Sequence, residues 1–370
     1  MTFRLTFASL LAISLTLATP THADLLPQNL PTGQISTLAG TGASGFAGDG
    51  GSASDAQLVD PRGLLISNDG SLVFADVSTE IGTIVRRIDV ESGLISAVAG
   101  DGGTEFDLFG ASGPALEFSL AEVGDVAQDE DGNLYLSETA LKRVLRVDPS
   151  GTISMVIGAE GTFGFSPLSA PTGLCYADGA LYVADVHQLF RHDLATGETD
   201  RIAGGLFDGF SGDDGLATFS RLNGVTDLVV DPSGHLYFAD SGNQRIRRID
   251  AVTDTITTVA YLQDLPATVD NPDADSRTIQ DLEVWGDGSL IIAEPGIIWQ
   301  LSPGGDTLIV AGQGTVGSTG NNGPATDAGI GVRSIAADTT GNLFIGDSSH
   351  TIRVVSGGIL LIEPEPVPDP

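Results

Sequence analysis

A short phrase recurs six times along this chain, and its spacing limits the folds that the chain can adopt. Each copy is a turn glycine followed by an alternating apolar segment and an acid, as in DGSLVFAD (Asp69–Asp76) and SGHLYFAD (Ser233–Asp240). The turn glycines lie 47 to 62 residues apart, at Gly70, Gly132, Gly179, Gly234, Gly288 and Gly341. A period of this length is typical of repeat proteins, in which each repeat forms one supersecondary unit.

Each repeat contains four segments with the composition of β-strands. An apolar run such as Gly63–Ser67 comes before the turn glycine, and the alternating strand follows it. An arginine-bearing segment comes next, as in Arg245–Asp250, and a segment rich in threonine and valine ends the repeat, as in Ile95–Gly100. β-Branched segments with period 2, bounded by Gly, Asp and Pro, indicate strands. Six four-stranded units of this length predict an all-β chain that folds as a six-bladed β-propeller.

The last repeat supplies only three strands and ends at Thr351–Val355, so the ring needs a fourth strand from elsewhere. The segment ISTLAG (Ile35–Gly40) matches the fourth-strand pattern and has no blade of its own. The competitor ILLI (Ile359–Ile362) does not match the repeat. We therefore predict that the N-terminal strand closes the last blade.

The two ends of the chain differ from the repeats. Residues 1–23 have the shape of a signal peptide, with Arg4 before an apolar stretch and a small-residue cleavage site, so we expect a periplasmic or secreted protein. Residues 24–32 form a short N-terminal extension, 33–358 the propeller, and 359–370 an acidic, proline-rich tail. Cys175 is the only cysteine, which excludes an intrachain disulfide, and we expect it to be a small buried residue.

Two stretches resemble a known family. GTGASGFAGDGGSASDAQLVDPRGLLIS and ADSGNQRIRRID are similar to NHL repeats of bacterial six-bladed propellers, and the resemblance extends from about Gly33 to Gly358. It implies the fold, but relatives with this architecture include binding modules, lactonases and lyases. The lactonase-like branch uses acidic and Asn ligands, which Asn223 with Gly224, before Asp227, matches in part. The amidating-lyase branch uses several histidines, and this chain has few.

The net charge of the chain limits the classes of partner that it can bind. Sixteen basic residues face 49 acidic ones, for a net charge of −33. Phosphate backbones and anionic membranes bind to positive patches, so nucleic acid and membrane surfaces are disfavoured. We expect a monomer without a membrane span that binds a protein, peptide or glycan ligand.

An acid ends the second strand of every repeat. Because a recurring residue usually has a structural role, we expect these six acids to bind loop backbone amides and arginines near one mouth of the central channel. They are Asp76, Glu138, Asp185, Asp240, Glu294 and Asp347.

The start of the first strand is more informative, because it differs between blades. Seven residues before the turn glycine stand Asp125, Asp227 and Asp281 in three repeats. The other three repeats carry Gly63, Thr172 and Ser334 there. Carboxylates that converge on an axis are suitable ligands for a hard cation, so this position predicts a Ca²⁺ site.

One residue earlier stand Arg62 and Arg333, in blades that are neighbours in a closed ring. Two guanidinium groups side by side can bind a carboxylate or a sugar acid. The alternative is structural: the Asp residues cap strand ends and the arginines pair with acids.

Two histidines follow the repeat acid on the same face, His187 and His350, and His235 belongs to the opposite face. In an enzyme, His187 or His350 would serve as the general base. Three functions follow from these patterns. The first is a binding module that presents the channel mouth. The second is a metal-assisted, lactonase-like hydrolase or lyase with Asp125, Asp227 and Asp281 as ligands. The third is a structural protein of the cell envelope.

Overall fold

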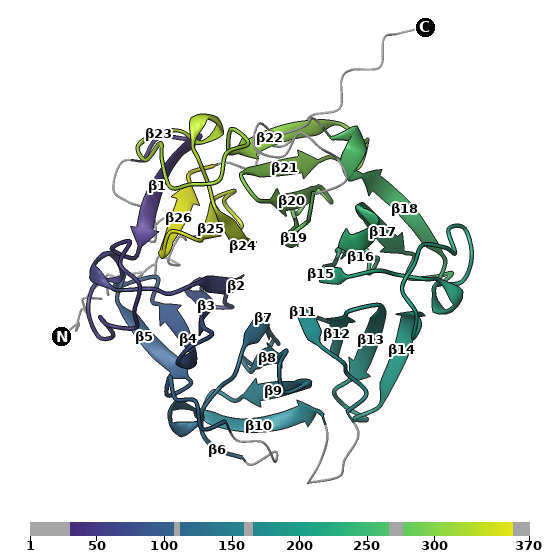
Figure 1. The fold of residues 1–370 in the computed structure, drawn as a ribbon, viewed down its shortest axis with the longest axis horizontal. Helices are drawn as coiled ribbons and strands as arrows, with labels where there is room; N and C mark the ends of the chain where they lie inside the picture. Colours follow the sequence, from purple (N-terminus) through teal and green to yellow (C-terminus); the bar gives the residue numbers. More distant parts are fainter. Residues whose placement is uncertain (1–29, 107–111, 159–165, 266–276, 358–370) are drawn as a thin grey trace, which may run out of the picture.

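Six four-stranded antiparallel blades surround a central channel (Figure 1). The computed structural model describes residues 30–106, 112–158, 166–265 and 277–357. The predicted signal peptide, most of the N-terminal extension and the acidic tail lie outside these residues. The prediction of a six-bladed β-propeller is confirmed.

The first three blades follow the chain in order, and each runs from its inner strand to its outer strand. Blade 1 contains β2 (Pro61–Ile66), β3 (Leu72–Ser78), β4 (Gly82–Ile88) and β5 (Ile95–Ala99). Blade 2 contains β7 (Val123–Gln128), β8 (Leu134–Glu138), β9 (Arg143–Val147) and β10 (Thr152–Ile157), with β6 (Gly113–Pro114) at its outer edge. Blade 3 contains β11 (Pro171–Ala177), β12 (Ala180–Asp185), β13 (Gln188–Asp193) and β14 (Thr199–Gly204).

The last three blades complete the ring. Blade 4 contains β15 (Val225–Val230), β16 (Leu236–Asp240), β17 (Arg245–Ile249) and β18 (Ile256–Tyr261). Blade 5 contains β19 (Asp281–Val284), β20 (Leu290–Glu294), β21 (Ile297–Leu301) and β22 (Thr307–Ala311). Blade 6 contains β24 (Val332–Ala337), β25 (Leu343–Asp347), β26 (Thr351–Val355) and β1 (Gln34–Ala39), with β23 (Gly323–Pro324) at its edge.

The ring is closed by the two ends of the propeller. β1 pairs antiparallel with β26, with Ile35 opposite Val355, and Figure 1 shows the purple strand beside the yellow one. The predicted closure by the N-terminal strand is therefore confirmed. The competing segment, residues 359–362, lies outside the described residues.

The hydrophobic core lies between neighbouring blades. Phe74 of blade 1, for example, packs in one cluster with Phe344 of blade 6, and Phe238 of blade 4 packs with Ala184 of blade 3. Each blade therefore buries its apolar faces only against its two neighbours, which is how a radial repeat can be long without a single large core. No helix in the described ranges is long and apolar enough to cross a membrane.

The six repeat acids are buried, with exposed fractions of 2% or less. The Asp76 carboxylate accepts the N–H of Val59 at 2.7 Å and pairs with Arg86 at 3.3 Å. The same arrangement recurs between Glu138 and Arg143. The structural role expected for these acids is confirmed, because five of them pair with an arginine and Asp185 accepts the N–H groups of Ser169 and Ala170. The arrangement is illustrated further by Asp240 with Arg247, Asp347 with Arg353, and Glu294 with Arg277.

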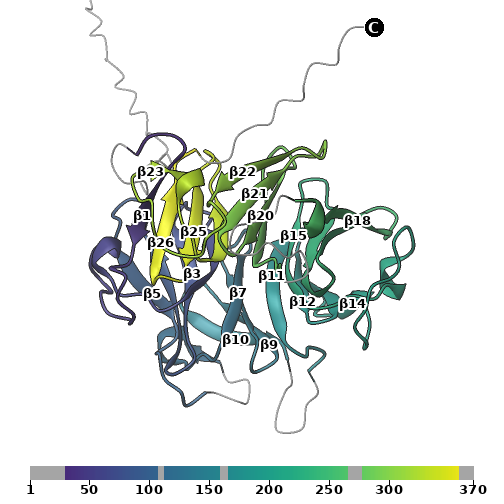
Figure 2. The ribbon, with the colours of Figure 1, turned by 45° about the horizontal axis from the view of Figure 1, so that its top comes forward.

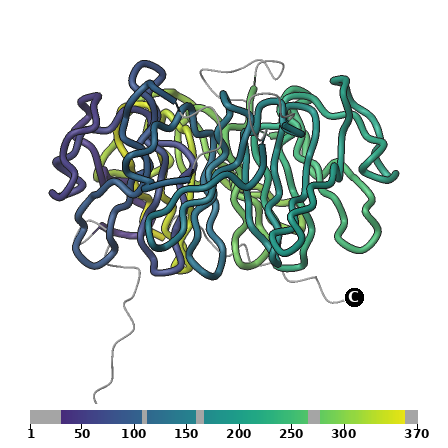
Figure 3. The backbone as a smooth tube through the Cα atoms, turned by 90° about the horizontal axis from the view of Figure 1, so that it is seen from below, coloured from purple at the N-terminus to yellow at the C-terminus, as the bar shows by residue number. Residues whose placement is uncertain are grey.

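The inner strands position the functional region. β7, β11 and β15 lie next to one another around the channel (Figure 2). Seen edge-on, the molecule is a ring whose loops lie on two opposite faces (Figure 3). Inner strands begin at one face and turn back at the other, so their first residues surround one mouth and their hairpin turns surround the other.

Ring closure by β1 can be tested with Ile35→Ala. The Ile35 side chain is fully buried between blades 5 and 6, so its truncation should lower the free energy of unfolding by about 2–5 kcal/mol. Urea unfolding measures the change, with Val252→Ala as the control because Val252 is 86% exposed and should cost less than about 0.5 kcal/mol. Equal stability of the two variants would show that β1 does not close the ring.

Candidate functional site

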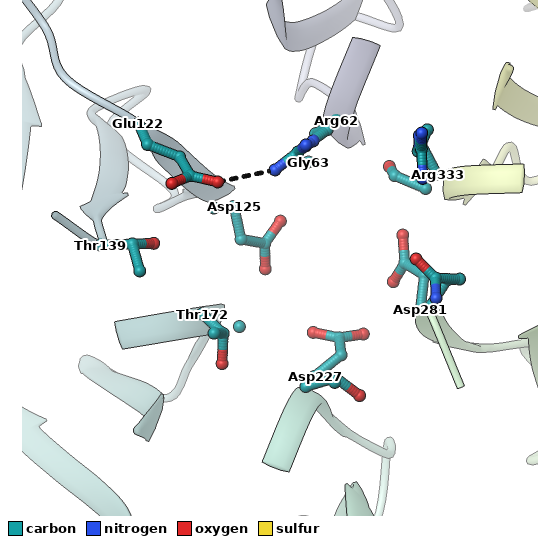
Figure 4. A pocket seen from close by; sticks show the side chains of 14 residues that line it. Arg62, Gly63, Glu122, Asp125, Thr139, Thr172, Asp227, Asp281 and Arg333 are labelled. Atoms are coloured by element: carbon teal, nitrogen blue, oxygen red, sulfur yellow. Dashed lines mark hydrogen bonds and ion pairs between the residues drawn. The ribbon is translucent and has the colours of Figure 1, made fainter. Parts of the chain in front are cut away.

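The mouth at which the inner strands begin contains a cavity of about 270 Å³. Asp125, Asp227 and Asp281 line it together with Arg62 and Arg333, so all five predicted ligand-binding residues face one space (Figure 4). The remaining lining residues are mostly small or polar: Gly63, Glu122, Gly124, Thr139, Thr172, Gly173, Thr226, Gln280 and Ser334.

The three aspartates are held by backbone amides of the next blade. Leu174 donates its N–H to Asp125 at 2.7 Å, and Leu282 donates its N–H to Asp227 at 2.8 Å. The same contact joins Ile335 to Asp281 at 2.7 Å, and Ser334 accepts the N–H of Leu64 at 2.7 Å in blade 1. Each acceptor therefore joins its blade to the following one.

Three of these amides, those of Leu64, Leu174 and Ile335, lie at a local irregularity of the strand pairing. The pairing of β2, β7, β11, β15 and β24 with their second strands shifts register near the start of the inner strand. A bulge leaves backbone groups without a partner in the ladder. A buried unpaired N–H costs about 1–3 kcal/mol, so a carboxylate or hydroxyl of the preceding blade stabilises the turn into the channel.

Blades 1 and 3 have glycine at this position. A Cβ on Gly63 would lie 2.8 Å from Cα of Asp125, and one on Gly173 would lie 2.6 Å from Oδ1 of Asp227. No side chain fits there, and in blade 2 the N–H of Val126 is bound by its own Asp125 at 2.8 Å.

The equivalent residue in blade 3 is therefore Gly173, not Thr172 as the sequence count predicted. Ala177 pairs with Ala180, so the β11–β12 turn consists of Asp178 and Gly179 only and is shorter than the other hairpin loops. Counting back from the turn glycine consequently misses the register by one residue. The Thr172 hydroxyl instead donates to the carbonyl oxygen of Val225 in blade 4 at 3.0 Å.

Hydroxyl groups form a second set of contacts between blades. Thr226 donates to the carbonyl oxygen of Ile279 at 3.0 Å, and Thr139 donates to that of Pro171 at 2.6 Å. These two wall hydroxyl groups are thus already bonded to the protein.

The carboxyl groups in the channel are forced close to one another. Burial and the neighbouring Asp281 raise the pKa of Asp227 well above its usual range, and the two carboxyl groups share a hydrogen bond. Burial likewise raises the pKa of Asp281 to about 7. Burial and Asp227 raise the pKa of Asp125. Protons are therefore retained in this cluster at pH values where an exposed aspartate is charged.

A fourth acid of the channel, Glu283, was not predicted from the sequence. It lies two residues after Asp281 along β19, deeper in the channel. Burial raises its pKa to about 7. A signal was available, because residues two apart in a strand face the same side and Glu283 follows Asp281 at that spacing. Cys175 lines the same deeper part of the channel and is half-buried, whereas a fully buried residue was expected. Its removal from bulk water and the nearby aspartates raise the pKa of its thiol.

The arginine pair is organised by an acid that the sequence analysis did not select. Asp60 binds Arg62 through one carboxylate oxygen at 2.7 Å and Arg333 through the other at 2.9 Å. Arg62 also bonds to Glu122 at 2.9 Å. Arg333 uses only its Nε atom in these contacts, and its side chain is 42% exposed. Its two Nη groups have no hydrogen-bond partner among the described residues, and Arg333 lines the cavity.

The two candidate histidines do not line the cavity. His187 accepts the N–H of Gly224 in blade 4 at 3.3 Å, and His350 bonds to the carbonyl oxygen of Val59, which precedes blade 1. Asn223 is also absent from the lining residues, and its N–H donates to Asp240. The two histidines thus join loops of neighbouring blades, whereas Asn223 bonds within blade 4. His235 lies near Asp250, on the other side of its blade, as expected.

A metal site would need several ligands around one ion. Within the described ranges, no three His, Cys, Asp or Glu side chains are grouped as a metal cluster. Calcium binding stays a prediction, and it would require Asp125, Asp227 and Asp281 to move from their backbone partners.

Comparison with known proteins supports the fold but does not define a family. No family model matches the chain. Mouse teneurin-4 is 30% identical over 240 residues, which is 55% of this chain and 8% of teneurin-4, so the chain spans less than a tenth of this relative. The chain also resembles solved structures that are less than 25% identical, and these likenesses concern the fold alone.

These structures include a binding protein and a lyase. An auxiliary nutrient binding protein from Bacteroides thetaiotaomicron is 17% identical, with a TM-score of 0.58 over 86% of this chain and 75% of that one. A catalytically inactive virginiamycin B lyase from Staphylococcus aureus, with quinupristin, is 15% identical, with a TM-score of 0.51 over 80% and 95% of the two chains. The class of protein is a six-bladed β-propeller, and its structural neighbours include both binding proteins and lyases.

The raised pKa values predict how stability depends on pH. Asp281 and Glu283 hold protons in the folded state up to about pH 7, whereas unfolded carboxyls lose them near pH 4. The folded state therefore binds more protons in this window, so these groups make the free energy of unfolding fall as pH rises from about 4 to 7. Glu283→Gln should remove part of that fall, on the order of 1–3 kcal/mol, in urea unfolding at pH 5 and pH 8.

The exposed Glu91→Gln serves as the control and should unfold with the same pH dependence as wild type. If Glu283→Gln also keeps the wild-type dependence, Glu283 titrates normally and the account of the channel acids is wrong.

Proposed function

We propose that this protein is an exported NHL-type propeller that binds the anionic end of a peptide, protein or glycan at the channel mouth. The predicted export signal and the two NHL-like stretches in the sequence support the assignment as an exported NHL-type propeller. The cavity beside Arg333 supports the binding of an anionic group at the channel mouth. The proposed ligand group is a carboxylate, either a peptide C-terminus or a sugar acid.

The observation that carries the proposal is the state of Arg333. Its guanidinium group is positioned through Nε by Asp60, while both Nη groups remain available at the cavity rim. A fixed guanidinium group loses little freedom on binding, and two parallel N–H donors match the two oxygens of a carboxylate. Arg62 adds positive charge beside it.

The cavity also limits the size of the ligand group. At about 270 Å³ it lies below the usual range for sites that enclose a whole drug-sized molecule. It can therefore admit one residue or one sugar unit, while the rest of the ligand would lie on the face of the propeller. A carboxyl group that keeps its proton in this cluster repels an anionic ligand less than an ionised one would.

A lactonase-like or lyase activity is the second candidate, and one observation favours it. A carboxyl group with a pKa near 7 can act as a general acid or base at neutral pH, and Asp281 has this property. The positions of His187 and His350 away from the cavity argue against their role as bases. An activity would then depend on the aspartates.

The binding proposal predicts the effect of Arg333→Ala. Calorimetry with dialanine and its C-terminal amide, and with glucuronate and glucose, shows whether a carboxylate is recognised. Dialanine or glucuronate should bind better than its neutral partner, and Arg333→Ala should weaken this binding about ten- to a hundredfold, the loss expected for hydrogen bonds to a charged group.

Arg191→Ala is the matched control, since Arg191 is similarly exposed on blade 3 and pairs with Asp193. It should bind the probes as wild type does. Equal binding of acid and neutral probes, or equal binding by the two variants, would contradict the proposal. The same titrations in EDTA and then in calcium chloride test the calcium prediction.

A further inference from the structure

We infer that the opposite mouth of the channel is a second binding site, specific for an organic ammonium group. A cavity of about 430 Å³ opens there, between the hairpin turns of blades 2 to 5. It shares no lining residue with the cavity beside Arg333. The deeper channel around Cys175 and Glu283 lies between the two.

Comparison of the repeats shows what is special about this mouth. Three residues before the turn glycine, most blades carry a residue that binds its own hairpin turn. Asp129 accepts the N–H of Asn133 at 2.8 Å, and Asp231 accepts that of His235 at 2.9 Å. Asp338 does the same with Asn342 at 3.0 Å, and Ser67 bonds to its own turn in blade 1.

Blade 5 departs from this pattern with Trp285. In blade 3 the equivalent residue is Ala177, because the β11–β12 turn is shorter. Tyr176 stands one residue earlier, and its hydroxyl accepts the N–H of Gly179 in its own turn at 3.2 Å. Neither Tyr176 nor Trp285 has the carboxylate that accepts turn amides in blades 2, 4 and 6. Both rings are only partly buried and line the cavity from the two sides of blade 4. Each ring also packs against a hydrophobic core cluster, so the observation that points to a ligand is that two aromatic side chains border one acidic cavity.

The charge of the cavity selects the ligand. Five acidic residues line it and no lysine, arginine or histidine does: Asp129, Glu130, Asp178, Asp231 and Glu283. Its amide donors are already engaged, because Asn68 donates to the carbonyl oxygen of Asp129 and Gln128 donates to that of Gly132. The Tyr176 hydroxyl is bonded to Glu130.

The groups that remain available to a ligand in this cavity are carboxylates and aromatic rings, and few hydrogen-bond donors are free. Aromatic faces attract cations through the ring quadrupole, and nearby carboxylates add direct charge attraction. A neutral sugar would need more donors than the engaged amides provide. An ammonium group can interact with both the aromatic rings and the carboxylates, whether it belongs to a free small amine or to a lysine side chain of a peptide.

The test is calorimetric titration of the whole protein with choline and with 3,3-dimethyl-1-butanol, a neutral molecule of nearly the same shape. Choline should bind, and the alcohol should bind at least about tenfold more weakly. Trp285→Ala should weaken choline binding about tenfold, within the range expected for a desolvated cation–π contact. Trp285→Phe, which retains an aromatic face, should recover most of the affinity and also shows that the fold tolerates a change at this position.

Arg333→Ala is the control, because it alters the other mouth and should leave choline binding unchanged. A parallel titration with acetyl-lysine amide distinguishes the sources: tighter binding than choline indicates a peptide side chain, and weaker binding indicates a small amine. The inference is overturned if choline and the alcohol bind equally, if neither binds, if maltose binds in preference to both, or if Trp285→Ala binds choline as wild type does.

Discussion

Where neighbouring blades meet at the channel, the backbone N–H groups at the start of the inner strands have to find acceptors. In most blades a bulge at the start of the inner strand leaves such groups outside the regular ladder. Asp125, Asp227, Asp281 and Ser334 supply the acceptors to the next blade. Gly63 and Gly173 instead allow the next blade to approach closely. The ring is therefore held at its centre by contacts between blades, in addition to the apolar packing farther out.

This constraint also shapes the function. The carboxyl groups that bind backbone amides are buried and crowded together, which raises their pKa values. The groups left for recognition lie at the two mouths. Arg333 offers free donors at one, and Tyr176 and Trp285 offer aromatic faces among carboxylates at the other. The two mouths thus suit ligand groups of opposite charge.

The sequence was sufficient for the fold, the closure by β1 and the structural role of the repeat acids, because each of these recurs with the repeat period. It also placed Arg62, Arg333 and the three aspartates around one mouth. It failed where geometry departs from the period: the short β11–β12 turn moves the equivalent residue from Thr172 to Gly173. The link between Arg333 and Asp60 could not be predicted either, because it joins residues 273 positions apart across the ring closure.

Amide-resolved hydrogen exchange tests the central claim most directly. The account predicts that the N–H groups of Leu64, Leu174, Leu282 and Ile335 exchange as slowly as amides of the blade cores, since each has a buried acceptor in the preceding blade. Asp227→Ala should accelerate exchange at Leu282, whose N–H keeps only the contact with the neighbouring Asp281, and leave Leu64, whose acceptor is Ser334, unchanged. Fast exchange of these four amides in the wild-type protein, or equal acceleration of Leu64 and Leu282, would contradict the account.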